Sequence, residues 1–329
     1  MHLREHHVKG SLVKRRNPLK AVGIAAVALT LAALSACGSP ETAGSDEVVT
    51  VKVGTLRGQP HLYQPYFYQA NAVEGVEFEV IQFDSSPDIT TAVTSGTVDF
   101  GITGVPSALS ALAGGKDIKV VASAADGGSG FMGNDSISSI EDLVGKNVGY
   151  PQGSSQEILL RLTLENAGVD IDDLSLVNLP FSDMAKALES KRIDAFLSAE
   201  LGPSTALAEG GHTIASPYET PVGKVNIAFI TTSTLIEKNP DLVQKVVDTH
   251  KAAVKYMTAH PDEWAAGLVK DFGLDEAVVA SAIDNIWLRS DLSQEYQDQV
   301  IALAEQMVEI SVLPNAPTAD EVFNTSFAP

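Results

Sequence analysis

The sequence predicts an α/β protein built from two similar halves, and three observations lead to this prediction. Short apolar segments alternate with helical segments over residues 49–113, and the same alternation resumes over residues 147–209. A glycine-rich stretch, 126–130, separates the two runs, and one segment of the first run recurs in the second. Because each strand is followed by a helix, we expect mostly parallel sheets that are covered on both faces.

In the first run, the strands are marked by β-branched and aromatic residues, and the helices by serine or proline at their starts. The expected strands are Val49–Thr55, Val76–Phe83, Phe100–Ile102 and Lys119–Ala124, and the expected helices are Pro87–Ser95 and Pro106–Ala113. We predict that the stretch Asp126–Gly130 then crosses to the second half.

The second run repeats the alternation. The expected strands are Asn147–Tyr150, Leu174–Leu179 and Ala195–Leu197, and the expected helices are Ser155–Ala167, Asp183–Ser190 and Pro203–Glu209. We expect Tyr218–Val225 to return the chain to the first half. A strand, Val225–Thr232, then precedes an almost entirely helical tail from Leu235 to about residue 312.

The recurring segment covers residues 88–100 and 183–195. Asp, Ala, Ser and Asp recur at one constant offset, and a Pro-Ser pair follows each copy at 106–107 and 203–204. Each copy predicts a helix, a turn, a strand, a loop and a helix start. This echo favours two related halves that offer the same loops to a shared cleft, although two unrelated α/β units could resemble each other by chance.

The N-terminus predicts export. Basic residues precede an apolar run, 21–36, that is shorter than the roughly 20 residues needed to span a bilayer. The run ends in Leu34-Ser35-Ala36-Cys37, which looks like a bacterial lipoprotein signal. We therefore expect a signal peptide over 1–36, a lipidated Cys37, and a flexible polar tether over 37–47.

Charge and composition argue against several classes of function. The formal net charge is −20, and the basic residues are scattered, so nucleic acid is not expected as a partner. Cys37 is the only cysteine, and beyond the expected signal peptide the histidines, which are His61, His212, His250 and His260, include no close pair with the spacing of metal ligands. The sequence also lacks a nucleophile elbow and a Walker loop. We therefore expect no metal, no cofactor and no catalysis.

Several segments together resemble one known family. They are Leu34–Cys37, Gly58–His61, Ser95–Gly101 with Pro106, Glu141–Gly149, Gly153–Ser155 and Arg192–Ala195. This pattern is similar to the nitrate/sulfonate/taurine/thiamine-precursor group of ABC-transporter substrate-binding proteins. The chain departs from it at 199–203, where relatives often carry a Trp-Glu-Pro-type segment, and it lacks the cysteine cluster of the related pyrimidine synthases.

The resemblance implies a two-lobed type II periplasmic-binding-protein fold with two hinge crossings and a helical C-terminal tail packed on lobe I. Lobe I would be 48–125 plus 226–329, and lobe II would be 126–225. The protein would be a monomer on the outer face of the cytoplasmic membrane, held by the lipid on Cys37. It would close around a solute and deliver it to a membrane permease.

The candidate ligand-binding residues come from helix starts and from the loops at which relatives of this family contact their ligands. They are Arg57, Gln59, His61, Tyr63, Ser86, Gly104, Ser107, Ala125, Gln152, Gly153, Ser154, Ser155, Asp183 and Glu200. The unpaired amides of helix starts attract anions, and a guanidinium can bind a carboxylate or sulfonate through two hydrogen bonds. A surface role is an open alternative for Arg57, Asp183 and Glu200.

A small organic anion is therefore the expected ligand. A compact heterocycle such as a thiamine precursor is the alternative, because tyrosines crowd residues 63–68. A cell-surface enzyme on the same scaffold is a further alternative.

Overall fold

The computed structural model describes residues 48–328, and all of them lie in one compact unit, Asp46–Pro329. The expected signal peptide 1–36, the lipidated Cys37 and the tether 37–47 lie outside the described residues.

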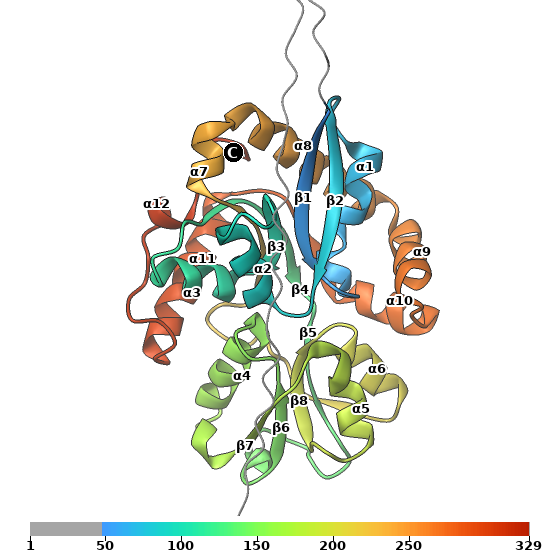
Figure 1. The fold of residues 1–329 in the computed structure, drawn as a ribbon. Helices are drawn as coiled ribbons and strands as arrows, with labels where there is room; N and C mark the ends of the chain where they lie inside the picture. The colour runs from blue at the N-terminus through green and yellow to red at the C-terminus, as the bar shows by residue number, and fades with distance from the viewer. Residues whose placement is uncertain (1–47, 329) are drawn as a thin grey trace, which may run out of the picture. The chain divides into compact units, whose positions relative to one another are not determined.

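The first sheet has six strands in the order β11-β4-β10-β3-β1-β2 (Figure 1). They are β1 (Val49–Leu56), β2 (Val76–Phe83), β3 (Phe100–Gly104), β4 (Lys119–Gly127), β10 (Val225–Thr231) and β11 (Ile286–Leu288). β1 runs parallel to β2 and to β3, whereas β10 is antiparallel to β3 and β4, and β11 is antiparallel to β4.

Helices cover both faces of this sheet. Figure 1 shows α2, α3 and α11 on one side and α1 and α8 on the other. The helices that precede or follow these strands are α1 (Tyr68–Asn71), α2 (Ser86–Thr94), α3 (Val105–Ala113), α7 (Ser233–Lys238), α8 (Pro240–Ala259), α9 (Pro261–Phe272), α10 (Glu276–Asp284), α11 (Gln294–Glu309) and α12 (Ala319–Val322). The tail that begins at α7 therefore packs mainly on the first sheet, as α8 on β4 and α11 on β10 illustrate.

The second sheet has five strands in the order β7-β6-β8-β5-β9. They are β5 (Ser129–Gly133), β6 (Asn147–Tyr150), β7 (Ser175–Asn178), β8 (Ala195–Ala199) and β9 (His212–Ala215). The helices between them are α4 (Ser155–Asn166), α5 (Met184–Glu189) and α6 (Gly202–Ala208).

The expectation of mostly parallel sheets is wrong, because both sheets are mixed. β5 joins the second sheet antiparallel to β8 and β9, just as β10 joins the first antiparallel to its neighbours. Three short strands, β5, β9 and β11, were not predicted. β5 is buried along its whole length and contains glycine at two of five positions, so it shows no alternating pattern.

The internal echo takes the same structure in both halves. In the first copy, the Lys52 amide donates to the Asp99 carboxylate (2.8 Å), and the Asp99 amide donates to the Lys52 carbonyl (2.9 Å). In the second copy, Asn147 and Asp194 exchange the same two hydrogen bonds, at 3.0 and 2.8 Å. The predicted order of helix, turn, strand, loop and helix start is confirmed in the second copy, whereas in the first β3 ends at Gly104 and α3 begins at Val105, with no loop between them.

The chain crosses between the two sheets at Gly128, which lies between β4 and β5, and again between β9 and β10. Gly127 and Gly128 both have positive φ, +74° and +69°. A Cβ at Gly127 would lie 2.4 Å from the Trp287 ring, so only glycine fits between the crossing and β11.

The helical tail also touches the second half. α10 packs against α6, and the Ser204 hydroxyl donates to the Ser281 hydroxyl at 3.3 Å. Within residues 48–328, every helix is too short or too polar to cross a bilayer.

Candidate functional site

The helices α2, α3 and α4 begin close to one another, at the carboxyl ends of strands from both sheets. The Gly104 amide, which precedes α3, donates to the Ser86 hydroxyl at 3.3 Å. A Cβ added at Gly104 would lie 3.0 Å from Ser155 Oγ, so the first residue of α4 is in contact with the start of α3. Ser155 also donates to the Asn226 carbonyl at the start of β10 (3.3 Å). Three predicted site residues, Ser86, Gly104 and Ser155, are thus brought together.

Serine side chains cap α2 and α4. Ser154 caps α4, because the Glu157 amide donates to its hydroxyl (3.3 Å). The capping box is incomplete, however, since the Glu157 carboxylate accepts from the amide of Gly153 (2.7 Å) and not from that of Ser154. For α2, however, Ser85 is the cap and Ser86 is the first helical residue. Asp183 precedes α5 without a side-chain cap bond, because the short turn Phe181–Asp183 already positions that helix start.

Three cavities open at this junction; one, of about 630 Å³, lies between α2 and α3 and reaches Gly153, and the other two combine loops and helix starts of both halves. The first of these two, of about 550 Å³, is lined by the helix starts of α2 and α4 and by the segment after β7, namely 84–87, 151–154 and 178–181. The second, of about 410 Å³, is lined by the loop after β1 and by residues from α5, α6 and the α9–α10 region; they include Arg57, Gln59, Phe181, Lys186, Leu201 and Phe272. Phe181 lines both of these cavities, so they adjoin at this residue. The 550 Å³ and 410 Å³ cavities together make up the candidate ligand cleft.

Arg57 stands at the mouth of the second cavity, and its guanidinium is held by the end of β2. Its Nε donates to the Asp84 carboxylate (3.1 Å), and its Nη1 donates to Gln82 Oε1 (2.6 Å). The Gln82 amide in turn donates to the Tyr66 hydroxyl at 2.8 Å. The Arg57 side chain is exposed, so its pair with Asp84 is a surface ion pair of modest strength.

Gln59 and His61 are buried behind Arg57. Gln59 Oε1 and His61 Nδ1 are enclosed and have no hydrogen-bond partner. Burial lowers the pKa of His61 to about 3, so the ring is neutral. The ring lies beside the crossing, because a Cβ at Gly128 would lie 3.2 Å from His61 Nδ1.

Tyr63 is not brought to the cleft with these residues. Its hydroxyl donates to the Asp271 carboxylate on α9 (2.5 Å), and its ring stacks on Tyr66 with centroids 4.5 Å apart. Burial and the neighbouring carboxylate raise the pKa of Tyr63. Gly267 on α9 leaves room for the ring, which therefore serves the packing of α9.

The remaining predicted residues have diverse surroundings. Ser107 is buried and shares a hydrogen bond with Thr90 (2.9 Å), and Ala125 is buried in β4. The Gln152 amide side chain pairs with that of Asn178 at 3.2 Å. Asp183 is exposed and accepts from the Ser182 hydroxyl at 3.1 Å.

Glu200 is buried at the start of α6, on the side of the crossing where α10 packs. Its carboxylate accepts from the Ser204 amide (3.1 Å) and from Asn285 Nδ2 (3.0 Å). Burial raises its pKa, and the two hydrogen bonds oppose that shift. With both oxygens bonded to protein, Glu200 holds α10 and the second sheet together in this structure.

Sequence reasoning missed Asn226. It is 2% exposed, and its Oδ1 has no partner although its Nδ2 donates to the Gly127 carbonyl. The available signal was one amide side chain at the start of an otherwise apolar strand, Val225–Ile230.

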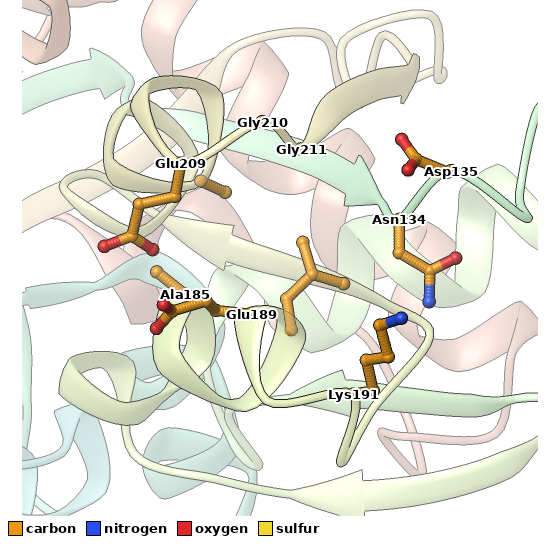
Figure 2. A pocket seen from close by; sticks show the side chains of 10 residues that line it. Asn134, Asp135, Ala185, Glu189, Lys191, Glu209, Gly210 and Gly211 are labelled. Atoms are coloured by element: carbon orange, nitrogen blue, oxygen red, sulfur yellow. The ribbon is translucent and has the colours of Figure 1, made fainter.

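A further pocket adjoins the second cavity, with which it shares Ala185 and Glu209. It is formed at the C-terminal ends of α5 and α6, and Figure 2 shows Glu189, Glu209 and Lys191 around it. Among residues 48–328, no group of three His, Cys, Asp or Glu side chains could hold a metal ion.

Comparison with known proteins gives both a family and a fold. The sequence model of the NMT1/THI5-like family matches residues 66–264. The chain is 29% identical over 215 residues to a Brucella abortus (strain 2308) protein provisionally named a binding protein, covering 64% of this chain and 67% of that protein. It is 24% identical over 259 residues to the formylaminopyrimidine-binding protein of Halalkalibacterium halodurans, covering 74% and 77%.

An enzyme is also among the relatives. A 4-amino-5-hydroxymethyl-2-methylpyrimidine phosphate synthase of Candida albicans (strain WO-1) is 27% identical over 210 residues, covering 58% of this chain and 61% of the synthase. Among solved structures, the alkanesulfonate-binding protein of Xanthomonas axonopodis pv. citri bound to MOPS superimposes with a TM-score of 0.74. It is 19% identical and covers 84% of this chain and 98% of its own, so it establishes the two-lobed periplasmic-binding-protein fold alone.

Proposed function

The chain belongs to the NMT1/THI5-like family, and we propose that it is the solute-binding component of an ABC importer that captures a small organic anion between its two halves. The observation that carries this proposal is the pair of helix starts, α2 and α4, that line one cavity of about 550 Å³. Amides at helix starts carry partial positive charge and favour anions.

The adjoining cavity supports the same ligand class. It contains two cationic side chains, Arg57 and Lys186, beside apolar ones from Phe181, Leu201 and Phe272. An anionic group near Arg57 and an apolar body against these apolar side chains would use both features. Gln82 and Asp84 hold the guanidinium in place, so part of the entropy cost of ordering it is already met.

Capture would proceed by hinge bending. We place lobe I at 48–125 plus 226–329 and lobe II at 126–225, with the hinge at the two crossings. A solute that contacts both lobes binds the closed form better than the open form and so shifts the equilibrium toward closure. The membrane permease would then recognise the closed form.

A compact heterocycle is the second candidate ligand. The observation that favours it is Gln59, a residue of the second cavity whose enclosed Oε1 has no partner and would accept from a ring amino group that reached it. The resemblance to a formylaminopyrimidine-binding protein points the same way.

A panel of solutes tests the proposal: thermal shift with alkanesulfonates, nitrate, carboxylates, pyrimidines and flavins. A ligand that binds only the folded state must raise the melting temperature. If every compound leaves the melting temperature unchanged at millimolar concentration, solute capture of these classes is wrong.

Arg57→Ala tests the anion site within that panel. We expect about a tenfold loss of affinity for a sulfonate that binds, because a charge-assisted hydrogen bond is worth about 1.5–3 kcal/mol. Arg192→Ala is the matched control, since Arg192 is exposed and lies in the turn after α5. Equal affinities for the two variants would remove Arg57 from the binding site and leave solute capture standing.

Binding without catalysis is part of the proposal, and mass spectrometry of the solute recovered after long incubation tests it. An altered mass would identify an enzyme, as the resemblance to a synthase requires us to check.

The proposal also includes a lipid anchor on Cys37, which rests on the sequence Leu34-Ser35-Ala36-Cys37. The protein would then sit at the outer face of the cytoplasmic membrane as a monomer. Cys37→Ser should move it from the membrane to the soluble fraction. If the protein that retains Cys37 is also found wholly in the soluble fraction, the predicted lipid anchor is wrong.

A further inference from the structure

Several buried polar atoms without a partner gather where β4 leaves the first sheet. Among the described residues, the side chains concerned in this region are Gln59, His61, Gln64, Asp126 and Asn226. Apart from the His61 ring nitrogen, each unpartnered atom is an amide or carboxylate oxygen and can only accept a hydrogen bond. Buried acceptors normally have a partner, so a cluster of them calls for a donor.

These side chains converge on residues 124–128. The Gln64 amide donates to the Ala124 carbonyl (3.1 Å), and the Asn226 amide donates to the Gly127 carbonyl. The His61 ring borders Gly128. Gln59 extends the cluster to the candidate cleft, because it is 7% exposed and lines the 410 Å³ cavity.

Asn226 is aimed by a β-bulge. In the pairing of β10 with β4, Val225 faces Asp126 and Ile227 faces Ala125, so Asn226 is the extra residue. A bulge re-aims the side chain of its extra residue, and bulges are common beside binding sites. Since Nδ2 is engaged by Gly127, the orientation of the amide is fixed and Oδ1 is left to accept. The Asn226 carbonyl meanwhile accepts from Ser155, at the start of α4.

The cluster carries little net charge. The Asp126 carboxylate accepts from Arg289 Nη1 at 2.6 Å, and Arg289 also pairs with Asp291 at 2.9 Å. The other three acceptors are neutral amides. The one carboxylate of the cluster is thus already paired with a guanidinium, and an uncharged N–H or O–H group would match the three amide oxygens.

We propose that Asn226 and Gln59 determine specificity by accepting a hydrogen bond from an uncharged hydroxyl or amino group of the solute. This inference rests on the proposed function and narrows its solute class to small molecules that carry such a group at the end lying against the strand crossing. Ordered water is the competing partner for these acceptors.

Two pairs of probes, each differing by one isosteric group, test the inference by calorimetry on the purified protein. The first pair is 2-hydroxyethanesulfonate and propane-1-sulfonate, and the second is 4-amino-2-methylpyrimidine and 2,4-dimethylpyrimidine. In each pair a hydroxyl or amino group replaces a methyl group. We expect the donor-bearing member of at least one pair to bind at least ~10-fold more tightly, since a buried acceptor left unpaired is costly.

Variants assign that preference to residues. Asn226→Leu and Gln59→Leu keep the approximate size of the side chain and remove the acceptor. Each should reduce the ratio of the two affinities within a probe pair to below ~3-fold. Thr163→Val is the matched control, because Thr163 also has a buried, unpartnered oxygen but lies near the far end of α4; it should keep the ratio. If Asn226→Leu fails to fold, Gln59→Leu decides alone.

The outcomes separate the two proposals. Equal binding within each pair, or a ratio that survives both leucine variants, overturns the inference, leaves solute capture intact and indicates water at the acceptors. Absence of binding by all four probes overturns the proposed solute classes and the inference with them.

Discussion

At the scale of single residues, His250 shows how the core holds a titratable group without charge. Its Nε2 donates to the Ser123 carbonyl (2.8 Å), which leaves Nδ1 to accept from the Tyr68 hydroxyl (2.7 Å). The ring also stacks on Phe229, with centroids 4.6 Å apart. Burial lowers the pKa of His250 to about 4, and the Ser123 carbonyl opposes that shift.

This environment predicts an acid-sensitive fold. The unfolded pKa is 6.5, so above that pH both states are neutral and the stabilisation is fully present. Between pH 6.5 and 4 the His250 ring binds a proton in the unfolded state but not in the folded state. The free energy of unfolding therefore falls as pH decreases. His61, with a pKa of about 3, acts in the same direction.

His250→Gln tests the prediction. The slope of unfolding free energy between pH 6.5 and 5, measured by urea denaturation, should fall by up to ~1.4 kcal/mol per pH unit. The variant should also be less stable at pH 8 by about 1–3 kcal/mol, because Tyr68 and Ser123 lose well-placed partners. A slope equal to that of the unmodified protein would contradict the assignment.

At the scale of elements, the starts of α2 and α4 meet closely. A Cβ added at Gly153, just before α4, would lie 2.8 Å from Cγ of Pro87 in the first turn of α2. Gly153 also has φ of +74°, which side chains other than glycine adopt reluctantly. The absence of a side chain at this position therefore allows the two helix starts to approach.

Gly153→Ala should keep these helix starts apart. We expect a loss of stability of about 1–2 kcal/mol from the backbone conformation, and in addition a severalfold weaker binding of a probe that the solute panel identifies. Gly168→Ala is the matched control: φ is +70°, but no atom lies within 4 Å of the added Cβ. Equal losses of affinity in both variants would show that the contact with Pro87 is unimportant for closure.

At the scale of the whole described unit, a third connection joins the two halves besides the two strand crossings. The Tyr218 hydroxyl donates to the Ser129 carbonyl (3.0 Å) and contacts Asn285 Oδ1 (3.1 Å), while Asn285 Nδ2 donates to Glu200. The crossings and α10 are thus tied together on one side. Any hinge motion should pivot about this network.

Trp287 is placed to report that motion. It lies on β11, 43% exposed, against the backbone of Gly127, and the Lys224 ammonium is 3.4 Å from the centroid of its ring. Both neighbours belong to the crossing segments. We expect a binding solute to change the tryptophan fluorescence of the protein by altering these contacts.

Two variants assign the signal. Trp264→Phe should keep the change, because Trp264 is buried on α9, whereas Trp287→Phe should abolish it. A change that persists in Trp287→Phe would place the conformational response elsewhere.

The sequence alone determined the local features of this protein. The alternation of strands and helices, the serine and proline residues at helix starts and the echo around Asp99 and Asp194 could all be read from it, because periodicity, caps and turns depend on neighbours within a few residues. The element order and the two-lobed fold followed from them and from the family resemblance.

Only the tertiary structure decided the strand directions and the partners of the candidate side chains. β5 pairs antiparallel, Arg57 is bound to Asp84, Tyr63 serves α9, and Asn226 is the bulged residue against Gly127. Each of these depends on contacts between residues far apart in the chain. Such contacts are set by how the layers pack, and local sequence patterns do not predict them.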